Sequence, residues 1–141
     1  MGRWRDGGGT LGVEVAEGGP WVEVPLEVAA SYRARTRGLL GRDGVEGALL
    51  LTPAASVHTF GMRFAVDVAY LDRRLRVLAV VTMRPGRLGL PRPRSLHVLE
   101  ADAGAMAGWG LRPGCRVRVA TGPGEDPRAA RPGPAGDADG R

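Results

Sequence analysis

The chain has 141 residues, a formal net charge of +5 at pH 7, 43% hydrophobic residues and a single cysteine. This length is typical of one domain with its own apolar core, and a lone cysteine excludes an internal disulfide. All 20 basic residues are arginines spread along the chain and only 5% of residues are aromatic, which disfavours a nucleic-acid surface built from clustered charge and stacking rings.

The two ends differ in composition from the middle of the chain. Residues 1–9 and 121–141 are rich in Gly, Pro and charge, and we expect both to be disordered because they offer little apolar surface to bury. Residues 10–120 then form a single domain. No apolar run is long enough to span a membrane, and the N-terminus as written lacks the apolar stretch of a secretory signal, so we expect a cytoplasmic protein.

The first half of the domain predicts two strands and a helix. TLGVEV (10–15) and WVEVPLEVA (21–29) alternate apolar and polar residues, the period of half-buried strands. In ASYRARTRGLLGR (30–42) the rhythm changes to that of a short helix, which Ser31 can cap and Gly41 can close.

The second half predicts further strands. GALLLTP (47–53) has the continuous apolar run of a strand covered on both faces, and residues 65–85 form a hairpin that turns at DRR (72–74). After a Pro/Gly loop (84–95) come a strand in LHVLEAD, a turn or helix in AGAMAGWGL and a closing strand in CRVRVA. The prediction is a mostly β domain, a compact antiparallel β-sandwich or partly open barrel with one or two short helices.

Three stretches combine charged and apolar residues: RTRGLLGR (35–42), SVHTFGMRFAVD (56–67) and HVLEADAG (97–104). Charges at buried strand positions are costly unless they are paired, so these residues form either a ligand site or a buried polar network. The candidates are Arg37, Arg42, His58, Thr59, Met62, Arg63, Asp67 and Glu100.

Asp67 lies between valines in the sequence FAVDVAYL. If Val66, Val68 and Tyr70 face one way, Asp67 faces the other and needs an arginine or backbone donors, with Arg37, Arg42 and Arg63 as the candidate arginines. It would then be an internal ion pair that braces a helix against the sheet, a carboxylate that faces a ligand, or a carboxylate that faces solvent.

His58 can titrate near neutral pH and is the first candidate for a general acid or base, although a hydrogen-bonded structural histidine is the simpler interpretation. Glu100 ends an apolar run and can bind loop amides, an arginine or a ligand. His58, His97 and Cys115 are too far apart in sequence to form a recognisable zinc motif, so we predict no metal and no cofactor.

Together the three stretches resemble the bacterial and archaeal family called domain of unknown function 192. The matching residues are Arg37, Gly38, Leu39, Leu40 and Arg42; then His58, Thr59, Phe60, Gly61, Met62, Arg63 and Asp67; then Val98, Leu99, Glu100 and Gly104. The resemblance implies a compact β-sandwich-like fold with a polar concavity where the motifs converge, and no established activity.

The chain differs from this pattern in two ways. Many relatives have an Asn-Thr after the basic residue, where this chain has Phe64 and Ala65. Many also carry an N-terminal export or lipoprotein segment, which we do not expect here. The form SVHTFGMRFAVD resembles an actinobacterial variant, some of whose genes lie near pilus or secretion clusters.

Taken together, these features favour a non-catalytic binding or accessory module over an enzyme. Its cleft would be lined by arginines, His58, Asp67 and Glu100, and would suit an anionic or hydroxyl-rich ligand such as a carboxylate, a phosphate or a saccharide. The alternatives are a small enzyme that uses His58 or Glu100 as general acid or base, and an accessory protein of pilus or secretion machinery that binds a protein partner. We expect a monomer.

Overall fold

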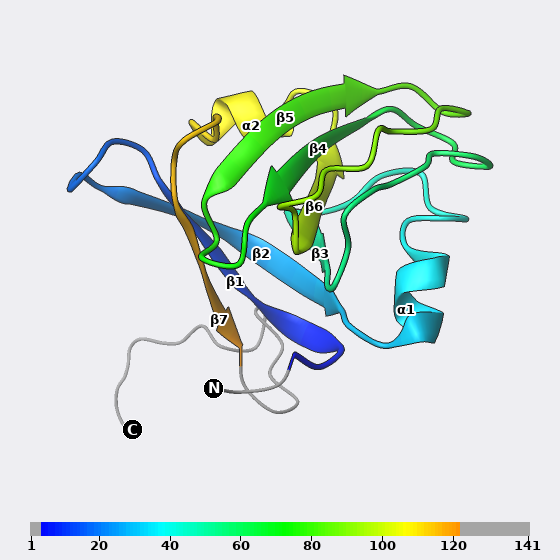
Figure 1. The fold of residues 1–141 in the computed structure, drawn as a ribbon, viewed down its shortest axis with the longest axis horizontal. Coiled ribbons are helices and arrows are strands. Elements are labelled where there is room, and N and C mark those ends of the chain that lie inside the picture. Colours follow the sequence, from blue (N-terminus) through cyan, green and yellow to red (C-terminus); the bar gives the residue numbers. More distant parts are fainter. Residues whose placement is uncertain (1–3, 122–141) are drawn as a thin grey trace.

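A computed structural model describes residues 4–121, which form seven strands and two short helices (Figure 1). The predicted disordered tail covers residues 121–141; Thr121 is instead the last residue of the final strand, and residues 122–141 lie outside the described residues. The elements are β1 (Gly7–Glu14), β2 (Trp21–Ala29), α1 (Tyr32–Arg37), β3 (Ala48–Leu51), β4 (Val66–Leu71), β5 (Val77–Met83), β6 (His97–Asp102), α2 (Ala105–Gly108) and β7 (Val117–Thr121).

The strands form one sheet in the order β5-β4-β6-β3-β2-β1-β7. The sheet curls until its two edge strands meet, where Val77 donates to the carbonyl of Cys115 (2.9 Å) and Val117 to that of Leu75 (3.0 Å). The two edges bond only near these residues, so the sheet does not close into a full barrel. The prediction of a mostly β domain with one or two short helices is confirmed, and of the two predicted architectures, a β-sandwich or a partly open barrel, the single curled sheet corresponds to the second.

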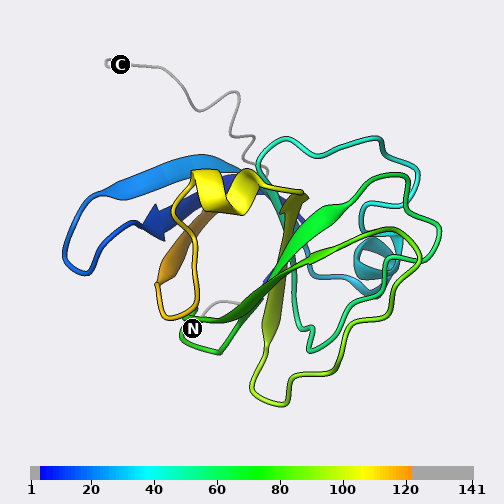
Figure 2. The same cartoon turned by 90° about the horizontal axis from the view of Figure 1, so that it is seen from above.

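One strand pair departs from the predicted antiparallel pattern. β2 and β3 run parallel, with Leu26 opposite Ala48 and Ala29 opposite Leu51. A parallel pair needs a crossover connection. Residues 30–47 provide it, and they carry α1 across to the side of the molecule where the loops gather (Figures 1 and 2).

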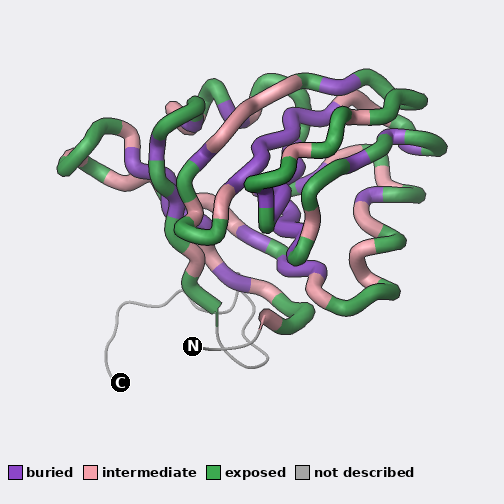
Figure 3. Tube along the Cα trace, viewed as in Figure 1, coloured by how far each residue is buried: buried purple, intermediate pink, exposed green. Residues whose placement is uncertain are grey.

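Both faces of the central strands are covered. All six residues of β4 are buried, as are five of the six in β6, and these strands run through the middle of the molecule (Figure 3). Val66, Val68 and Tyr70 pack in one apolar cluster, while Ala69 and Leu71 pack in the other. The predicted alternation of side chains along β4 is therefore confirmed.

The helix in the first half is shorter than the sequence predicted. Ser31 caps it as expected, because its hydroxyl accepts from the amide of Ala34 at 3.0 Å. The helix ends at Gly38 (φ 48°) rather than at Gly41, and the Gly38 amide donates to the carbonyl of Ala34 at 2.9 Å. Gly38 can adopt a positive φ at little steric cost, so the helix ends there, and Gly41, which also has a positive φ (80°), lies in the turn that follows.

The first strand begins at Gly7, so Gly7 to Gly9 belong to the sheet although their composition placed them in the N-terminal extension. Gly9 lies between β2 and β7, and a Cβ there would collide with the carbonyl of Ala120. The absence of a side chain thus permits this close approach of strands. Asp6 fixes the start of β1, since its carboxylate accepts from the amides of Ala30 and Ser31.

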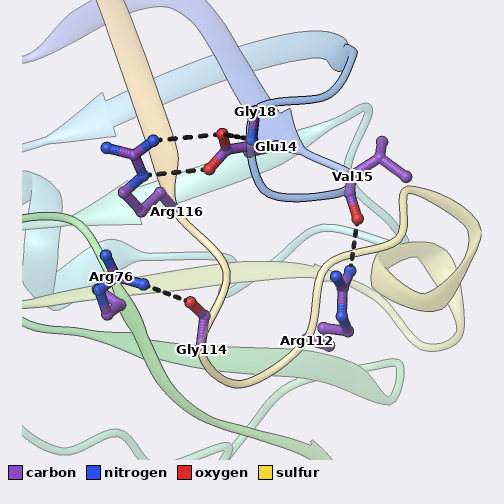
Figure 4. A network of polar contacts seen from close by, with 7 residues as sticks. All are labelled: Glu14, Val15, Gly18, Arg76, Arg112, Gly114 and Arg116. Carbon is purple, nitrogen blue, oxygen red and sulfur yellow. Dashed lines mark hydrogen bonds and ion pairs between the residues drawn. The ribbon is translucent and has the colours of Figure 1, made fainter.

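A polar network joins the segment that precedes β7 to β1 and to the start of β5 (Figure 4). Glu14, 5% exposed, accepts from the Arg116 guanidinium at 3.1 and 3.2 Å and from the amide of Gly18 at 2.9 Å. These hydrogen bonds lower the pKa of the Glu14 carboxyl, the bond from Arg116 having the largest effect. Arg76 donates to the carbonyl of Gly114 at 2.7 Å. Each carboxylate oxygen of Glu14 has a donor, as a buried charge requires.

Neither of the two helices in residues 4–121 is long and apolar enough to cross a membrane.

Candidate functional site

A hollow of about 340 Å³ opens between α1, the segments that follow α1 and β3, and one face of the sheet. We call it the Glu100 pocket, because Glu100 is the only acidic residue in its lining. Apolar residues make up about half of the lining: Leu39, Leu40, Leu51, Pro53, Ala54, Ala55, Val57 and Met62. The polar ones besides Glu100 are Tyr32, Arg35, Thr36, Arg37, Ser56 and His58.

Strand pairing places Glu100 in the middle of an apolar face. β6 lies between β3 and β4, and Glu100 stands opposite Leu49 on one side and Val68 on the other. Both neighbours belong to the apolar cluster that also contains Val66 and Tyr70. The carboxyl group of Glu100 therefore rises from an otherwise hydrophobic surface.

Glu100 is 3% exposed, and no hydrogen bond or ion pair from residues 4–121 reaches its carboxyl group. Burial raises the pKa of this carboxyl to about 7. Near neutral pH the group is thus divided between a protonated form, which can donate a hydrogen bond, and an ionised form, which only accepts.

His58, Met62 and Arg37 share this pocket with Glu100. Met62 is buried in the wall, whereas His58 and Arg37 are exposed. The His58 Nδ1 accepts from the amide of Phe60 at 3.2 Å, and the His58 and Phe60 rings stack with their centroids 5.0 Å apart. Within residues 4–121, no hydrogen bond or ion pair engages the Arg37 side chain.

Four other candidates lie elsewhere. Thr59 is fully buried and donates to the carbonyl of Arg84 at 2.6 Å while it accepts from the amide of Arg87 at 2.8 Å, so it holds the 84–87 loop in place. Arg63 pairs with Asp43 on the surface at 3.2 Å.

Arg42 makes a two-bond pair with Glu27 at 2.6 and 3.1 Å. It lines a separate groove of about 760 Å³ between α1 and β2, which Arg37 also borders.

Asp67 faces the opposite side of the sheet from Glu100. It is 4% exposed and accepts from the Thr82 hydroxyl (2.7 Å) and from the amides of Gly104 (2.9 Å) and Met106 (3.1 Å). The prediction of an arginine partner is therefore wrong, and the backbone donors that the sequence left as an alternative are the ones present. Asp67 does brace a helix against the sheet, because Gly104 and Met106 belong to the start of α2.

The single cleft expected around all the charged candidates is thus not formed. Arg37, His58, Met62 and Glu100 come together, whereas Asp67 lies behind the sheet and Arg63 on the outer surface. The sequence reasoning also missed the apolar walls formed by Leu51 and Val57. No pattern marked them as site residues, because apolar residues in a strand and a loop are ordinarily core.

Comparison with known proteins places this chain in a family. The sequence model of DUF192, described as "Uncharacterized ACR", matches residues 13–119. A UPF0127 protein of Pyrococcus horikoshii is 30% identical over 87 residues, which cover 58% of this chain and 76% of that protein. This relative is archaeal, so the association with actinobacteria and with pilus or secretion machinery stays a prediction.

Two solved structures share the fold. A protein of unknown function from Novosphingobium aromaticivorans has a TM-score of 0.67 and 21% identity, and the match covers 77% of this chain and 83% of that one. A Sinorhizobium meliloti protein described as a candidate transcription regulator has a TM-score of 0.65 and 17% identity, with 84% and 98% covered. At these identities the likeness shows the fold alone.

Proposed function

Because this chain belongs to the DUF192 family of uncharacterised proteins, we propose its function from its own geometry: it is a binding module that holds a small ligand in the Glu100 pocket. The observation that carries this proposal is Glu100 itself. A buried carboxyl group without a hydrogen-bond partner costs stability, whereas Glu14 and Asp67, the other buried carboxylates of residues 4–121, are hydrogen-bonded. A ligand that hydrogen-bonds to Glu100 would remove that cost.

The chemistry of the lining favours a ligand with hydroxyl groups and an anionic group. A hydroxyl can donate to the ionised form of Glu100 or accept from the protonated form. An anionic group is repelled by ionised Glu100 but attracted by the guanidinium of Arg37, which is exposed and has no ion-pair partner among residues 4–121. Sugar acids, sugar phosphates and hydroxy acids have both features. The pocket of about 340 Å³ lies at the small end of the range for ligand sites, which runs from about 300 to 1,000 Å³.

A thermal-shift screen tests this proposal. Neutral sugars, sugar acids, sugar phosphates and hydroxy acids are compared on the parent, Glu100→Gln, Arg37→Met and Arg42→Met. A ligand at a hundredfold excess over its Kd stabilises the protein by about 2.7 kcal/mol, which is readily measured. We expect an anionic polyol to stabilise the parent and the Arg42→Met control equally, and to lose most of its effect on the other two variants.

Comparison of the Arg37→Met and Arg42→Met variants separates binding in the Glu100 pocket from attraction by general positive charge. Arg37 and Arg42 are five positions apart and both lie near α1, but only Arg37 lines the Glu100 pocket. Equal loss of the ligand effect in both arginine variants would mean that general charge attracts the ligand, and the proposed site would be wrong.

A second candidate function is an enzyme with Glu100 as general acid or base. One observation favours it: a carboxyl with a pKa of about 7 is matched to proton transfer near neutral pH, and His58 lines the same pocket. Against it, no hydrogen bond within residues 4–121 joins a hydroxyl group of the pocket lining to His58 or Glu100.

Incubation of any ligand found in the screen distinguishes the two functions. The ligand is followed by NMR with the parent and with Glu100→Gln for several hours. We expect an unchanged ligand spectrum in both samples. Conversion by the parent that disappears in Glu100→Gln would establish the enzyme instead.

A further inference from the structure

Nearly all of the large apolar side chains that are exposed in residues 4–121 lie at one end of the molecule. We define the loop end as residues 32–47, 53–64 and 84–94, which gather on the side of α1 in two perpendicular views (Figures 1 and 2). Of the six large hydrophobic side chains that are exposed in residues 4–121, five belong to it: Tyr32, Leu40, Phe60, Leu88 and Leu90. Leu88 and Leu90 are 72% and 74% exposed.

The same end holds a strong excess of positive charge. The loop end contains nine arginines and two carboxylates, whereas the rest of residues 4–121 contains seven arginines and nine carboxylates. The 84–94 loop has four arginines and no acidic residue, and two of the arginines lie on each side of Leu88 and Leu90. The net charge of the whole chain conceals this asymmetry.

These apolar side chains come from segments that are held together. His58 forms an isolated antiparallel bridge with Leu88 and stacks on Phe60. Leu40 lies close to Gly61, the residue after Phe60, since a Cβ on Gly61 would lie 3.5 Å from the Leu40 Cδ2. The three loops therefore present one joint surface and not three independent tips.

We propose that the loop end docks on an anionic lipid surface. Arginines near such a surface attract its phosphate and carboxylate groups, and exposed leucines gain from burial at the boundary between headgroups and acyl chains. This proposal does not rest on ligand binding in the Glu100 pocket.

The alternative partners fit this surface less well. Single-stranded nucleic acid is bound through stacking of successive bases on exposed rings. The exposed apolar residues of the 84–94 loop are leucines and Phe60 already stacks on His58, which leaves Tyr32 among the exposed rings of the loop end. An acidic protein would supply the charge, yet Leu88 and Leu90 lie on an extended loop and line neither of the two hollows described above. A lipid surface accepts protruding side chains without a complementary shape.

Vesicle sedimentation tests the proposal with the full chain. Extruded vesicles of phosphatidylcholine with roughly 30% phosphatidylglycerol are compared with pure phosphatidylcholine at low and moderate salt. The variants are Leu88→Ser/Leu90→Ser, Arg84→Gln/Arg87→Gln and, as a control, Arg73→Gln/Arg74→Gln in the β4–β5 turn. The two arginine pairs remove the same charge from different places.

We expect the parent to bind the anionic vesicles and not the neutral ones, with affinity that falls as salt rises. The leucine pair and the Arg84/Arg87 pair should each weaken binding at least about tenfold, and the Arg73/Arg74 pair by less than about twofold. Absence of binding to anionic vesicles, equal effects of the two arginine pairs, or full binding by the leucine variant would each overturn the proposal. Salt-dependent binding to a DNA duplex that survives the leucine substitutions would assign the surface to nucleic acid instead.

Discussion

Asp67 and Glu100 lie on neighbouring strands, are buried to the same degree and face opposite sides of the sheet. Asp67 receives hydrogen bonds from one hydroxyl and two backbone amides, whereas Glu100 receives none from residues 4–121. Burial alone therefore does not separate a structural carboxylate from a candidate site carboxylate. The donors around each group make the difference, because they determine whether the ionised form is stabilised in the folded state.

The two faces also differ in how they are covered. On the Asp67 face, the start of α2 lies directly against the carboxylate and supplies its two amide donors. On the Glu100 face, α1 and the loops leave a hollow. The closed face thus serves stability, and the open face is the one where binding is proposed.

The largest expected effect is at Asp67. Replacing Asp67 by Ala leaves the amides of Gly104 and Met106 without their acceptor and opens a void beneath α2. We expect the free energy of unfolding to fall by about 4 kcal/mol, measured by urea denaturation. Asp67→Asn keeps one acceptor oxygen and should lose about half as much. A loss below about 1 kcal/mol for Asp67→Ala would mean that this face does not depend on the carboxylate.

Glu100 should behave in the opposite way. Its pKa in the folded protein, about 7, lies above the ordinary 4.5, so the folded state binds the proton more tightly than the unfolded state does. Stability is therefore lost as pH rises through this window, by about 3 kcal/mol in total. Glu100→Gln removes the ionisation, so at about pH 8 it should be more stable than the parent by up to this amount, and at about pH 4 it should match the parent.

Glu14 provides the internal control for this pH experiment. The pKa of Glu14 is lowered, chiefly by Arg116, so its contribution to stability is present above the ordinary pKa and lost as pH falls through the folded value. Glu14→Gln should therefore destabilise the protein at about pH 8, which is the opposite sign to Glu100→Gln. If both variants change stability in the same direction at that pH, the contrast between partnered and unpartnered carboxylates fails.

A smaller effect is expected from Thr82→Val, which keeps the shape of the side chain but removes the hydroxyl that Asp67 accepts from. We expect a loss of about 1.5 kcal/mol, with Thr82→Ser close to the parent. Equal losses in the valine and serine variants would assign the effect to packing rather than to the hydrogen bond.

The smallest effect should come from Arg42→Met. Its pair with Glu27 is partly exposed to solvent, at 37% and 50% of the two side chains. Pairs of this kind contribute about 0 to 1 kcal/mol, so urea denaturation should show a change below about 1 kcal/mol. A larger loss would show that this arginine has a structural role that its exposure does not suggest.

The amino-acid sequence by itself determined the strands, the hairpin at residues 72–74 and which residues of β4 share a face, since these follow from local patterns of apolar residues and turns. It also indicated that Asp67 and Glu100 needed explanation, because charge between buried strand residues is costly.

The tertiary structure alone decided what each carboxylate meets. The donors to Asp67 come from 15, 37 and 39 positions away. Glu100 shares a pocket with Arg37 because the parallel crossover between β2 and β3 carries α1 over this face, and with His58 because the segment after β3 lines the same hollow. Alternation along a strand tells which side a residue faces, but the segment that covers that side is set by long-range topology. The difference between a carboxylate that accepts hydrogen bonds, as Asp67 does, and one that accepts none from residues 4–121, such as Glu100, therefore arises only when the chain is folded.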